Sequence, residues 1–166
     1  LLDVAEPQVS GLLEHLNQYL IADDVHMSDL SNDLTMLSLQ GPAAASTLSQ
    51  LLDSGSLPIH NMNHTQIECA GNKIRAIHAT HTGQPGFDLV ISREKVLAIV
   101  RLPNAQAIPW FGMDTQEILR IEGGVPKYGI DMNADTLLLE TCMDDAISFT
   151  KGCYLGQETV ERLHSR

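Results

Sequence analysis

Two periods alternate in the pattern of apolar and polar residues along the chain, one typical of helices and one of strands. Residues 7–21 place apolar side chains three or four positions apart, which predicts an amphipathic helix lying on a sheet. Residues 93–102 and 114–124 show the same period and predict two further helices. The last one begins at Asp114, has Glu117 three residues later as in a capping box, and ends at paired glycines. These signals make its predicted ends the clearest in the chain.

Strands are predicted at four runs that alternate apolar and polar residues or are rich in β-branched ones: residues 33–40, 65–70, 73–81 and 86–92. Gly41-Pro42 turns the chain after the first run into a helix-forming stretch, residues 43–53. Gly71-Asn72 joins the second run to the third as a hairpin. Because the strands come as hairpin-like neighbours and not in strict βαβ order, we expect an α+β fold with mostly antiparallel sheets and packed helices.

The composition is that of an ordinary globular protein, with 166 residues of which 43% are apolar and 19% charged. We expect one domain or a compact pair of subdomains. The net charge of −11 repels a phosphate backbone, so direct, tight nucleic-acid binding is not expected. No apolar run approaches the ~20 residues that span a bilayer, so no membrane partner is expected either.

The positions of the cysteines and histidines predict no metal site, and the cysteine count indicates a reducing compartment. Cys69, Cys142 and Cys153 make an odd count with no C-x-x-C pair, which argues against a disulfide framework and a closed zinc site. We therefore predict a cytoplasmic location or an equivalent reducing lumen. The spacing of His60 and His64 would serve a metal only on a helix, and their neighbours favour a loop. An iron–sulfur ligand set from the three cysteines lacks a cluster spacing and a fourth ligand.

The first candidate for chemistry is a cysteine near the end of the chain. The stretch FTKGCYLGQETVERLHSR places Cys153 two residues after Lys151 and shortly before a helix start predicted at Gly156-Gln157. A nearby cation and a helix N-terminus both favour the thiolate, which is the reactive form of the side chain. The alternative is that the flanking glycines shape a tight turn around a buried, inert cysteine. The spacing alone does not decide between the two interpretations.

The second candidate is the stretch HTGQPGFDL, in which a glycine-rich turn delivers Asp88 onto the start of a strand. A carboxylate held there could accept two parallel hydrogen bonds from the edge of a pterin or guanine ring. The alternative is an ordinary hairpin with Asp88 solvated on the surface.

Four motifs resemble one known family. They are LQGPAA (39–44), TGQPGFDL (82–89), RIEGGVPKYGIDM (120–132) and ISFTKGCYLGQE (147–158). Together they resemble the YgfZ family of folate-binding proteins, relatives of the glycine-cleavage T-protein, an aminomethyltransferase. The string KGCYLGQE, Lys151 to Glu158, resembles the signature of YgfZ-type proteins and of their mitochondrial iron–sulfur assembly counterparts.

The resemblance implies a tetrahydrofolate-binding α+β scaffold that serves as an accessory protein for the assembly or repair of iron–sulfur enzymes, including tRNA-modifying ones. Its partners would be folate and iron–sulfur client or assembly proteins. Residues 1–166 would form part of the folate-binding domain, with an upstream segment and a downstream β-barrel of the family outside this chain. The lack of an initiator methionine agrees with that expectation.

The resemblance also implies site residues. Cys153 would act as a reactive thiol, kept partly ionised by Lys151, through redox chemistry, transient cluster contact or a one-carbon adduct. Asp88 occupies the position at which the superfamily's acidic residue contacts the pterin, although aspartate is one methylene shorter than the usual glutamate. His81 stands where relatives often have a tyrosine, and it is the second expected folate contact.

Two competing functions are an aminomethyltransferase of glycine cleavage and a degenerate module that only binds a partner protein. Gln116 counts against the transferase, because the true aminomethyltransferases that the chain resembles would have an arginine there, and so does KGCYLGQE. A partner-binding module predicts that Cys153→Ser is silent. Whether the protein turns over a substrate stays open at this point.

Overall fold

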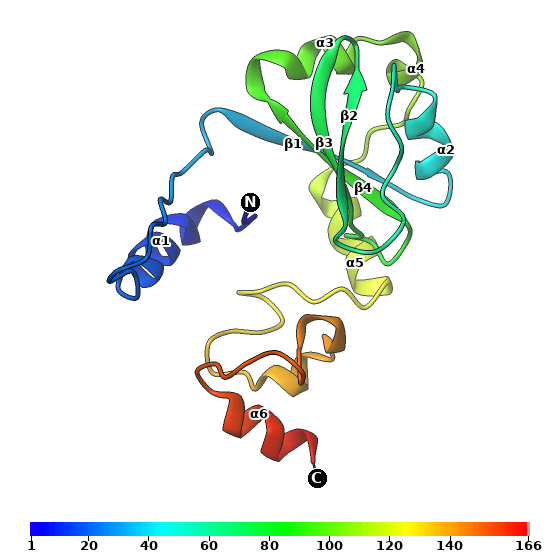
Figure 1. Cartoon of the computed structure of the whole chain (residues 1–166). Helices are drawn as coiled ribbons and strands as arrows, with labels where there is room; N and C mark the ends of the chain where they lie inside the picture. The colour runs from blue at the N-terminus through cyan, green and yellow to red at the C-terminus, as the bar shows by residue number, and fades with distance from the viewer. Residues whose placement is uncertain (166) are drawn as a thin grey trace.

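The chain is described over residues 1–165 by a computed structural model, which shows helices around one antiparallel sheet (Figure 1). The sheet has the strand order β1-β4-β3-β2, and each neighbouring pair is antiparallel. Its strands are β1 (Leu34–Gln40), β2 (His64–Cys69), β3 (Asn72–His78) and β4 (Gly86–Ser92). The predicted α+β fold with antiparallel pairing is confirmed, and the bounds of β4 are those predicted from the sequence.

The hairpin between β2 and β3 turns one residue earlier than predicted. Its turn residues are Ala70 and Gly71, both with positive φ (50° and 68°), while Asn72 already pairs with Cys69 in the sheet. A two-residue hairpin of this kind needs positive φ at both central positions, which glycine adopts without strain. The Asp53 carboxylate accepts a hydrogen bond from the Gly71 N–H at 2.7 Å and so fixes the turn from outside the hairpin.

The helical segments are η1 (Glu6–Gln8), α1 (Val9–Asn17), α2 (Ala44–Ser49), η2 (Arg93–Lys95), α3 (Val96–Val100), α4 (Pro103–Gln106), α5 (Met113–Glu122), η3 (Leu138–Thr141), η4 (Asp144–Ala146) and α6 (Gln157–His164). Each predicted helix has a counterpart in the structure, while α4, η3 and η4 were not predicted. None of the described helices is long and apolar enough to cross a membrane.

The predicted packing of the first helix on the sheet is wrong. The helix α1 forms, but it buries none of its residues, and Figure 1 shows it to one side of the sheet. Residues 22–33 run without helix or strand between α1 and β1, so no short connection ties the helix to the sheet. Amphipathic spacing therefore predicted the helix but not its partner.

The capping box predicted for α5 is also wrong. The helix begins at Met113, with the extended residue Gly112 at its N-cap and no side-chain capping bond, so Asp114 lies inside the first turn. The Glu117 carboxylate pairs instead with the guanidinium of Arg120, one turn further on. The predicted C-terminus is confirmed, since Gly123 follows the helix and Gly124 has a φ of +65°.

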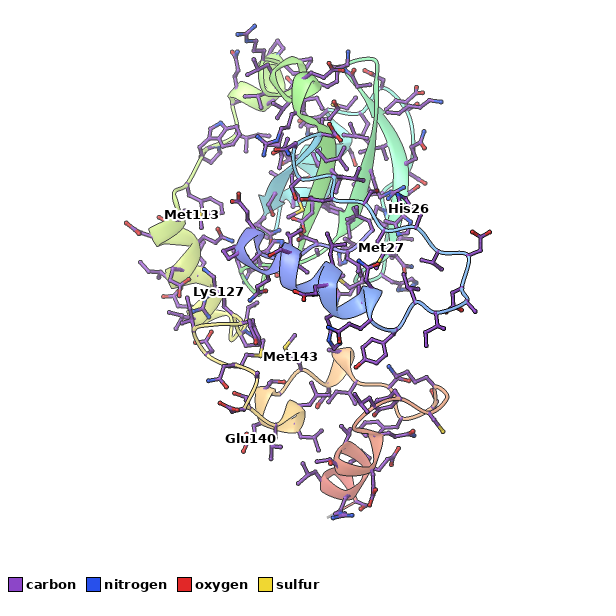
Figure 2. The ribbon with its side chains drawn as sticks, turned by 90° about the vertical axis from the view of Figure 1, so that its left-hand side faces the viewer. His26, Met27, Met113, Lys127, Glu140 and Met143 are labelled. Atoms are coloured by element: carbon purple, nitrogen blue, oxygen red, sulfur yellow. The ribbon has the colours of Figure 1, made fainter. Side chains whose placement is uncertain are left out.

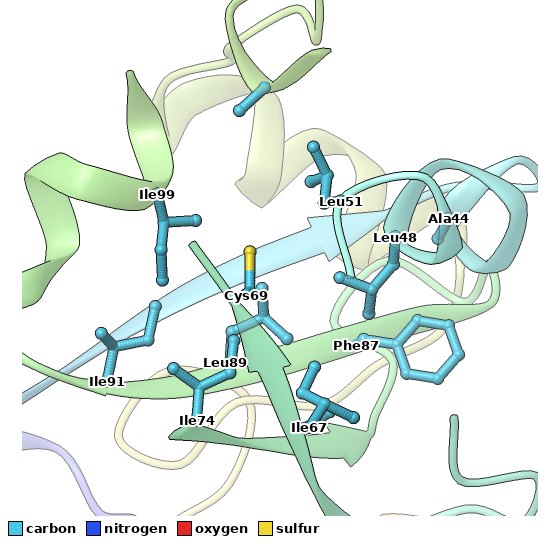
Figure 3. Packing of buried hydrophobic residues seen from close by; sticks show 12 residues of the cluster. Ala44, Leu48, Leu51, Ile67, Cys69, Ile74, Phe87, Leu89, Ile91 and Ile99 are labelled. Atoms are coloured by element: carbon cyan, nitrogen blue, oxygen red, sulfur yellow. The ribbon is translucent and has the colours of Figure 1, made fainter. Parts of the chain in front are cut away.

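The hydrophobic core lies on the face of the sheet that α2, α3 and α4 cover (Figure 3). The strands contribute alternate residues, as the pleat requires, so Phe87, Leu89 and Ile91 of β4 belong to the core. The buried members are Ala44, Leu48, Leu51, Ile67, Cys69, Ile74, Ala76, Phe87, Leu89, Ile91, Ile99 and Ala105. By the same alternation Asp88 faces the opposite side of the sheet.

The C-terminal part of the chain is separate from this core. Figure 1 shows η3, η4 and α6 apart from the sheet, beyond the end of α5. Within residues 1–165, no hydrogen bond or ion pair joins residues 133–165 to an earlier residue. The two candidate sites predicted from the sequence consequently lie in different parts of the structure.

Candidate functional site

Asp88 is a buried carboxylate with both oxygens already engaged. The residue is 4% exposed, which rules out the solvated surface aspartate considered as an alternative. Its Oδ1 accepts a hydrogen bond from Ser38 Oγ at 2.7 Å, and its Oδ2 lies 2.8 Å from His81 Nε2. Ser38 is the residue opposite Asp88 in the β1–β4 register, so the sheet itself brings these two side chains together.

Gln40 completes a closed ring of hydrogen bonds around the carboxylate. Its amide nitrogen donates to Ser38 Oγ at 2.9 Å and to the carbonyl oxygen of Ala79 at 3.2 Å. Its amide oxygen accepts from the backbone N–H of His81 at 3.0 Å. A Cβ at Gly86 would overlap the Gln40 carboxamide, so glycine at that position leaves room for the ring. The arrangement fixes both the backbone and the side chain of His81.

The ion pair with Asp88 stabilises the charged form of His81. The hydrogen bond to Asp88 raises the pKa of the imidazole above 6.5; burial opposes this effect, and the charges of Asp88 and Asp3 add to it. A raised folded-state pKa means that the pair contributes stability below about pH 6.5, the unfolded value. That contribution is lost as the pH rises through the folded-state pKa of His81.

His81 lines a pocket of about 180 Å³ between the sheet and α5. The helix contributes Met113, Gln116, Glu117 and Arg120, and residues 125–127 close the far side. Figure 2 shows Met113 and Lys127 towards opposite ends of α5. A larger hollow of about 570 Å³ runs along residues 56–65, but it holds none of the residues singled out from the sequence as contacting a ligand.

A charged network joins α5 to the loop that follows it. The Arg120 guanidinium, although the residue is only 6% exposed, donates to Glu117, to the carbonyl oxygen of Val125 at 2.9 Å and to Asp131 Oδ2 at 2.6 Å. The same Asp131 oxygen accepts from the backbone N–H of Lys127 at 2.8 Å. Hydrogen bonding to Arg120 lowers the pKa of Glu117, and this bond in turn raises the pKa of Arg120.

The sequence analysis did not identify this network as part of a site. Glu117 and Arg120 lie three residues apart on a helix, a spacing that brings side chains together, and this was the available signal. The role of Asp131 depends on the path of residues 123–131, which no local pattern predicts. The network shapes the pocket wall and holds Lys127 beside it.

Two glycines bring α5 against the turn that carries His81. A Cβ at Gly123 would lie 2.5 Å from the carbonyl oxygen of Thr82, and a Cβ at Gly83 would lie 2.8 Å from the Cα of Gly123. Real Cβ atoms do not approach other atoms so closely. The absence of side chains at these two positions therefore sets the distance between the helix and the turn.

Cys153 lies on the surface of the separate C-terminal part. The residue is exposed, so the interpretation as a buried filler in a turn is wrong. Gly156, with a φ of +86°, precedes α6, which begins at Gln157 as predicted. The Lys151 ammonium stands over the ring of Tyr154, 4.4 Å from its centroid, a cation–π contact. An activating role of Lys151 toward Cys153 stays a prediction.

The three cysteines occupy different environments. Cys69 is 1% exposed and packs in the core (Figure 3), whereas Cys142 and Cys153 are both on the surface. In the part of the chain that the structure describes, no three His, Cys, Asp or Glu side chains converge as metal ligands. The structure brings His81 and Asp88 together, and it does not bring Cys153 and Lys151 to them.

Comparison with known proteins gives one family. The sequence model described as the GCVT N-terminal domain matches residues 3–151. An aminomethyltransferase from Synechocystis sp. is 28% identical over 150 residues, which are 90% of this chain and 39% of that protein. An aminomethyltransferase from Herpetosiphon aurantiacus is 31% identical over 148 residues, 87% of this chain and 40% of that protein.

A third relative carries a less specific name. A putative chloroplastic transferase from Arabidopsis thaliana is 27% identical over 164 residues, which are 98% of this chain and 38% of that protein. The chain thus spans about two fifths of the length of these relatives. The matched region includes the sheet, the His81–Asp88 pair and α5.

Proposed function

The chain belongs to the GCVT N-terminal domain family, and on this premise we propose that it binds tetrahydrofolate or a one-carbon derivative in the pocket between His81 and α5. The family match over residues 3–151 is the observation that carries the proposal. The pocket supports it, because His81, held in place by Asp88, and charged residues on α5 line a cavity that could receive a ring with several hydrogen-bonding atoms.

We further propose that the protein is an accessory factor of the YgfZ type for the assembly or repair of iron–sulfur enzymes, including tRNA-modifying ones. The support is the string KGCYLGQE together with the exposure of its cysteine, since a thiol must reach solvent to meet a partner protein. In this proposal Cys153 reacts with a partner or transfers a group to it, and Lys151 stabilises the thiolate form of Cys153. The partners are iron–sulfur clients or assembly proteins, in the cytoplasm.

The second candidate function is aminomethyl transfer, which the names of the relatives support. Against it stands Gln116, a neutral residue in the pocket wall at the position where an aminomethyltransferase is expected to have an arginine. A neutral amide lacks the charge that would anchor the anionic tail of a folate at that position. We therefore favour the accessory role.

Folate binding is testable by thermal unfolding of the protein with 5-formyltetrahydrofolate. A ligand at a hundredfold excess over its dissociation constant is expected to stabilise the protein by about 2.7 kcal/mol. Gln116→Trp should abolish this shift, because an indole fills much of a cavity of about 180 Å³. Leu97→Trp, at a residue 56% exposed on α3, is the matched control and should keep the shift. A wild type that ligand does not stabilise would exclude the folate proposal.

The role of the thiol is testable in cells that lack the gene. Full-length protein is expected to restore the activity of an iron–sulfur tRNA-thiolating enzyme, and Cys153→Ala is expected to lose most of that rescue. The control is Cys142→Ala, which removes the other exposed cysteine of the same C-terminal part and should rescue like the wild type. Rescue by Cys153→Ala would support the assembly role but show that it does not require the thiol. If no form rescues the activity, aminomethyl transfer is favoured.

A further inference from the structure

His81 and Asp88 differ in how far a ligand can reach them. The side chain of Asp88 is 6% exposed and that of His81 is 34% exposed. Each oxygen of Asp88 already has a partner, Ser38 or His81, whereas only His81 lines the pocket. We propose that His81, and not Asp88, contacts the bound folate, as an imidazolium that donates a hydrogen bond from Nδ1 to an acceptor atom of the ligand.

This inference rests on the proposed folate site and assigns the group that recognises the ligand there. The imidazole uses Nε2 for Asp88, and its Nδ1 has no hydrogen-bonding partner within residues 1–165. A protonated ring donates from both nitrogens, while a neutral ring bound through Nε2–H offers only an acceptor at Nδ1. Folates carry acceptors of the required kind, the pterin carbonyl oxygen and the tail carboxylates, so protonation decides whether the contact forms.

Asp88 acts in this proposal as a positioning residue. Ser38 holds one carboxylate oxygen, and the other oxygen orients the His81 ring. Gln40 fixes the backbone of the same histidine through its amide oxygen. The histidine is thereby held at its backbone and at its ring before any ligand arrives, which reduces the entropy lost on binding.

The charges around His81 favour the imidazolium. Of the charged residues that face it, those on α5 and its loop pair with one another: Arg120 bonds to Glu117, and Lys127 Nζ lies 3.6 Å from Glu117 Oε2. The two others, Asp88 in β4 and Asp3 near the N-terminus, are acidic and raise the pKa of His81. A charge-assisted bond from this ring is stronger than a neutral one.

The test is the dissociation constant of 5-formyltetrahydrofolate for the full-length protein, measured by calorimetry from about pH 6 to about pH 8.5. Wild-type affinity is expected to weaken about tenfold over this range as His81 loses its proton. His81→Gln should bind with the weak, high-pH affinity throughout and show no pH dependence. The matched control is His60→Gln, at an exposed histidine outside the pocket, which should behave like the wild type.

Asp88→Asn separates positioning from direct contact. If Asp88 positions His81, this variant should move the midpoint of the pH dependence to lower pH and keep the low-pH affinity within about threefold. A loss of about tenfold at every pH with an unmoved midpoint would overturn the proposal, and so would a pH-independent wild type. If Asp88→Asn does not fold, the His81→Gln measurement decides alone.

Failure of the inference is distinguishable from failure of the folate site. A wild type that binds folate without pH dependence overturns only the assignment of His81, while a wild type that binds no folate overturns both. An NMR titration of the His81 ring in the ligand-free protein measures the effect of Asp88 on the protonation of His81 independently of folate. It should report a pKa above 6.5 that falls in Asp88→Asn.

Discussion

Replacing Gly123 by alanine is expected to lower the free energy of unfolding by about 1–3 kcal/mol and to weaken folate binding strongly. The added Cβ would lie 2.5 Å from the Thr82 carbonyl oxygen, 2.7 Å from its carbonyl carbon and 2.9 Å from the Cα of Gly83. All three are backbone atoms, so no side-chain rotation relieves the overlap. Either α5 or the turn before β4 must move, and that turn carries His81.

The measurement pairs denaturant unfolding with folate titration of the same variant. The control is Gly11→Ala in α1, where the new Cβ meets nothing within 4 Å and a helix-favouring residue replaces glycine. This control should not lower stability and should bind folate normally. A Gly123→Ala variant as stable as the wild type, with unchanged affinity, would contradict the close packing of α5 on the turn.

The sheet was the part of the fold that the sequence predicted well, because strand signals are local. The alternation over 33–40 and the turn glycines before β4 fixed the bounds of β1 and β4 to within one residue, whereas β3 ends at His78, three residues before the end predicted at His81. The hairpin turn moved by one residue, to Ala70 and Gly71, because the pairing of Asn72 with Cys69 decides it. Residue pairing across a sheet is a tertiary property, which local propensities do not encode.

The errors in the helices have a similar origin. Spacing located α1 correctly, but where a helix packs depends on tertiary contacts, and α1 buries none of its residues. For α5, Glu117 satisfied the capping-box pattern, yet a buried arginine one turn later competes for the same carboxylate. The buried guanidinium needs charged acceptors and Glu117 supplies one, so this carboxylate does not cap the helix.

The candidate site was predicted in position but not in structure. The glycine-rich turn indicated Asp88 at the start of a strand, and the structure places it there. Its burial depends on Ser38 and Gln40, which are far away in sequence and reach it through the register of β1 with β4. The exposure of Cys153 depends likewise on the separation of the C-terminal part from the core, which no local pattern indicated.

The second large effect is expected in the core. Leu48→Ala should lower the free energy of unfolding by about 3 kcal/mol, because Leu48 is fully buried and its loss removes apolar contacts and leaves a cavity. Leu48 packs from α2 onto the core face of the sheet (Figure 3), and Asp88 of β4 faces the other side by strand alternation. In a protein of this size the change corresponds to a fall in melting temperature of about 6–12 °C.

The size of that effect is set by burial, and a matched substitution tests this directly. Leu97→Ala makes the same chemical change on the nearby helix α3, at a residue 56% exposed, and should cost less than about 1 kcal/mol. Because the core and the His81–Asp88 pair lie on opposite faces of the sheet, Leu48→Ala should keep the folate affinity below its new melting temperature. Equal losses of stability in the two variants would show that α2 does not pack on the sheet as described, and the assignment of the two faces would fail with it.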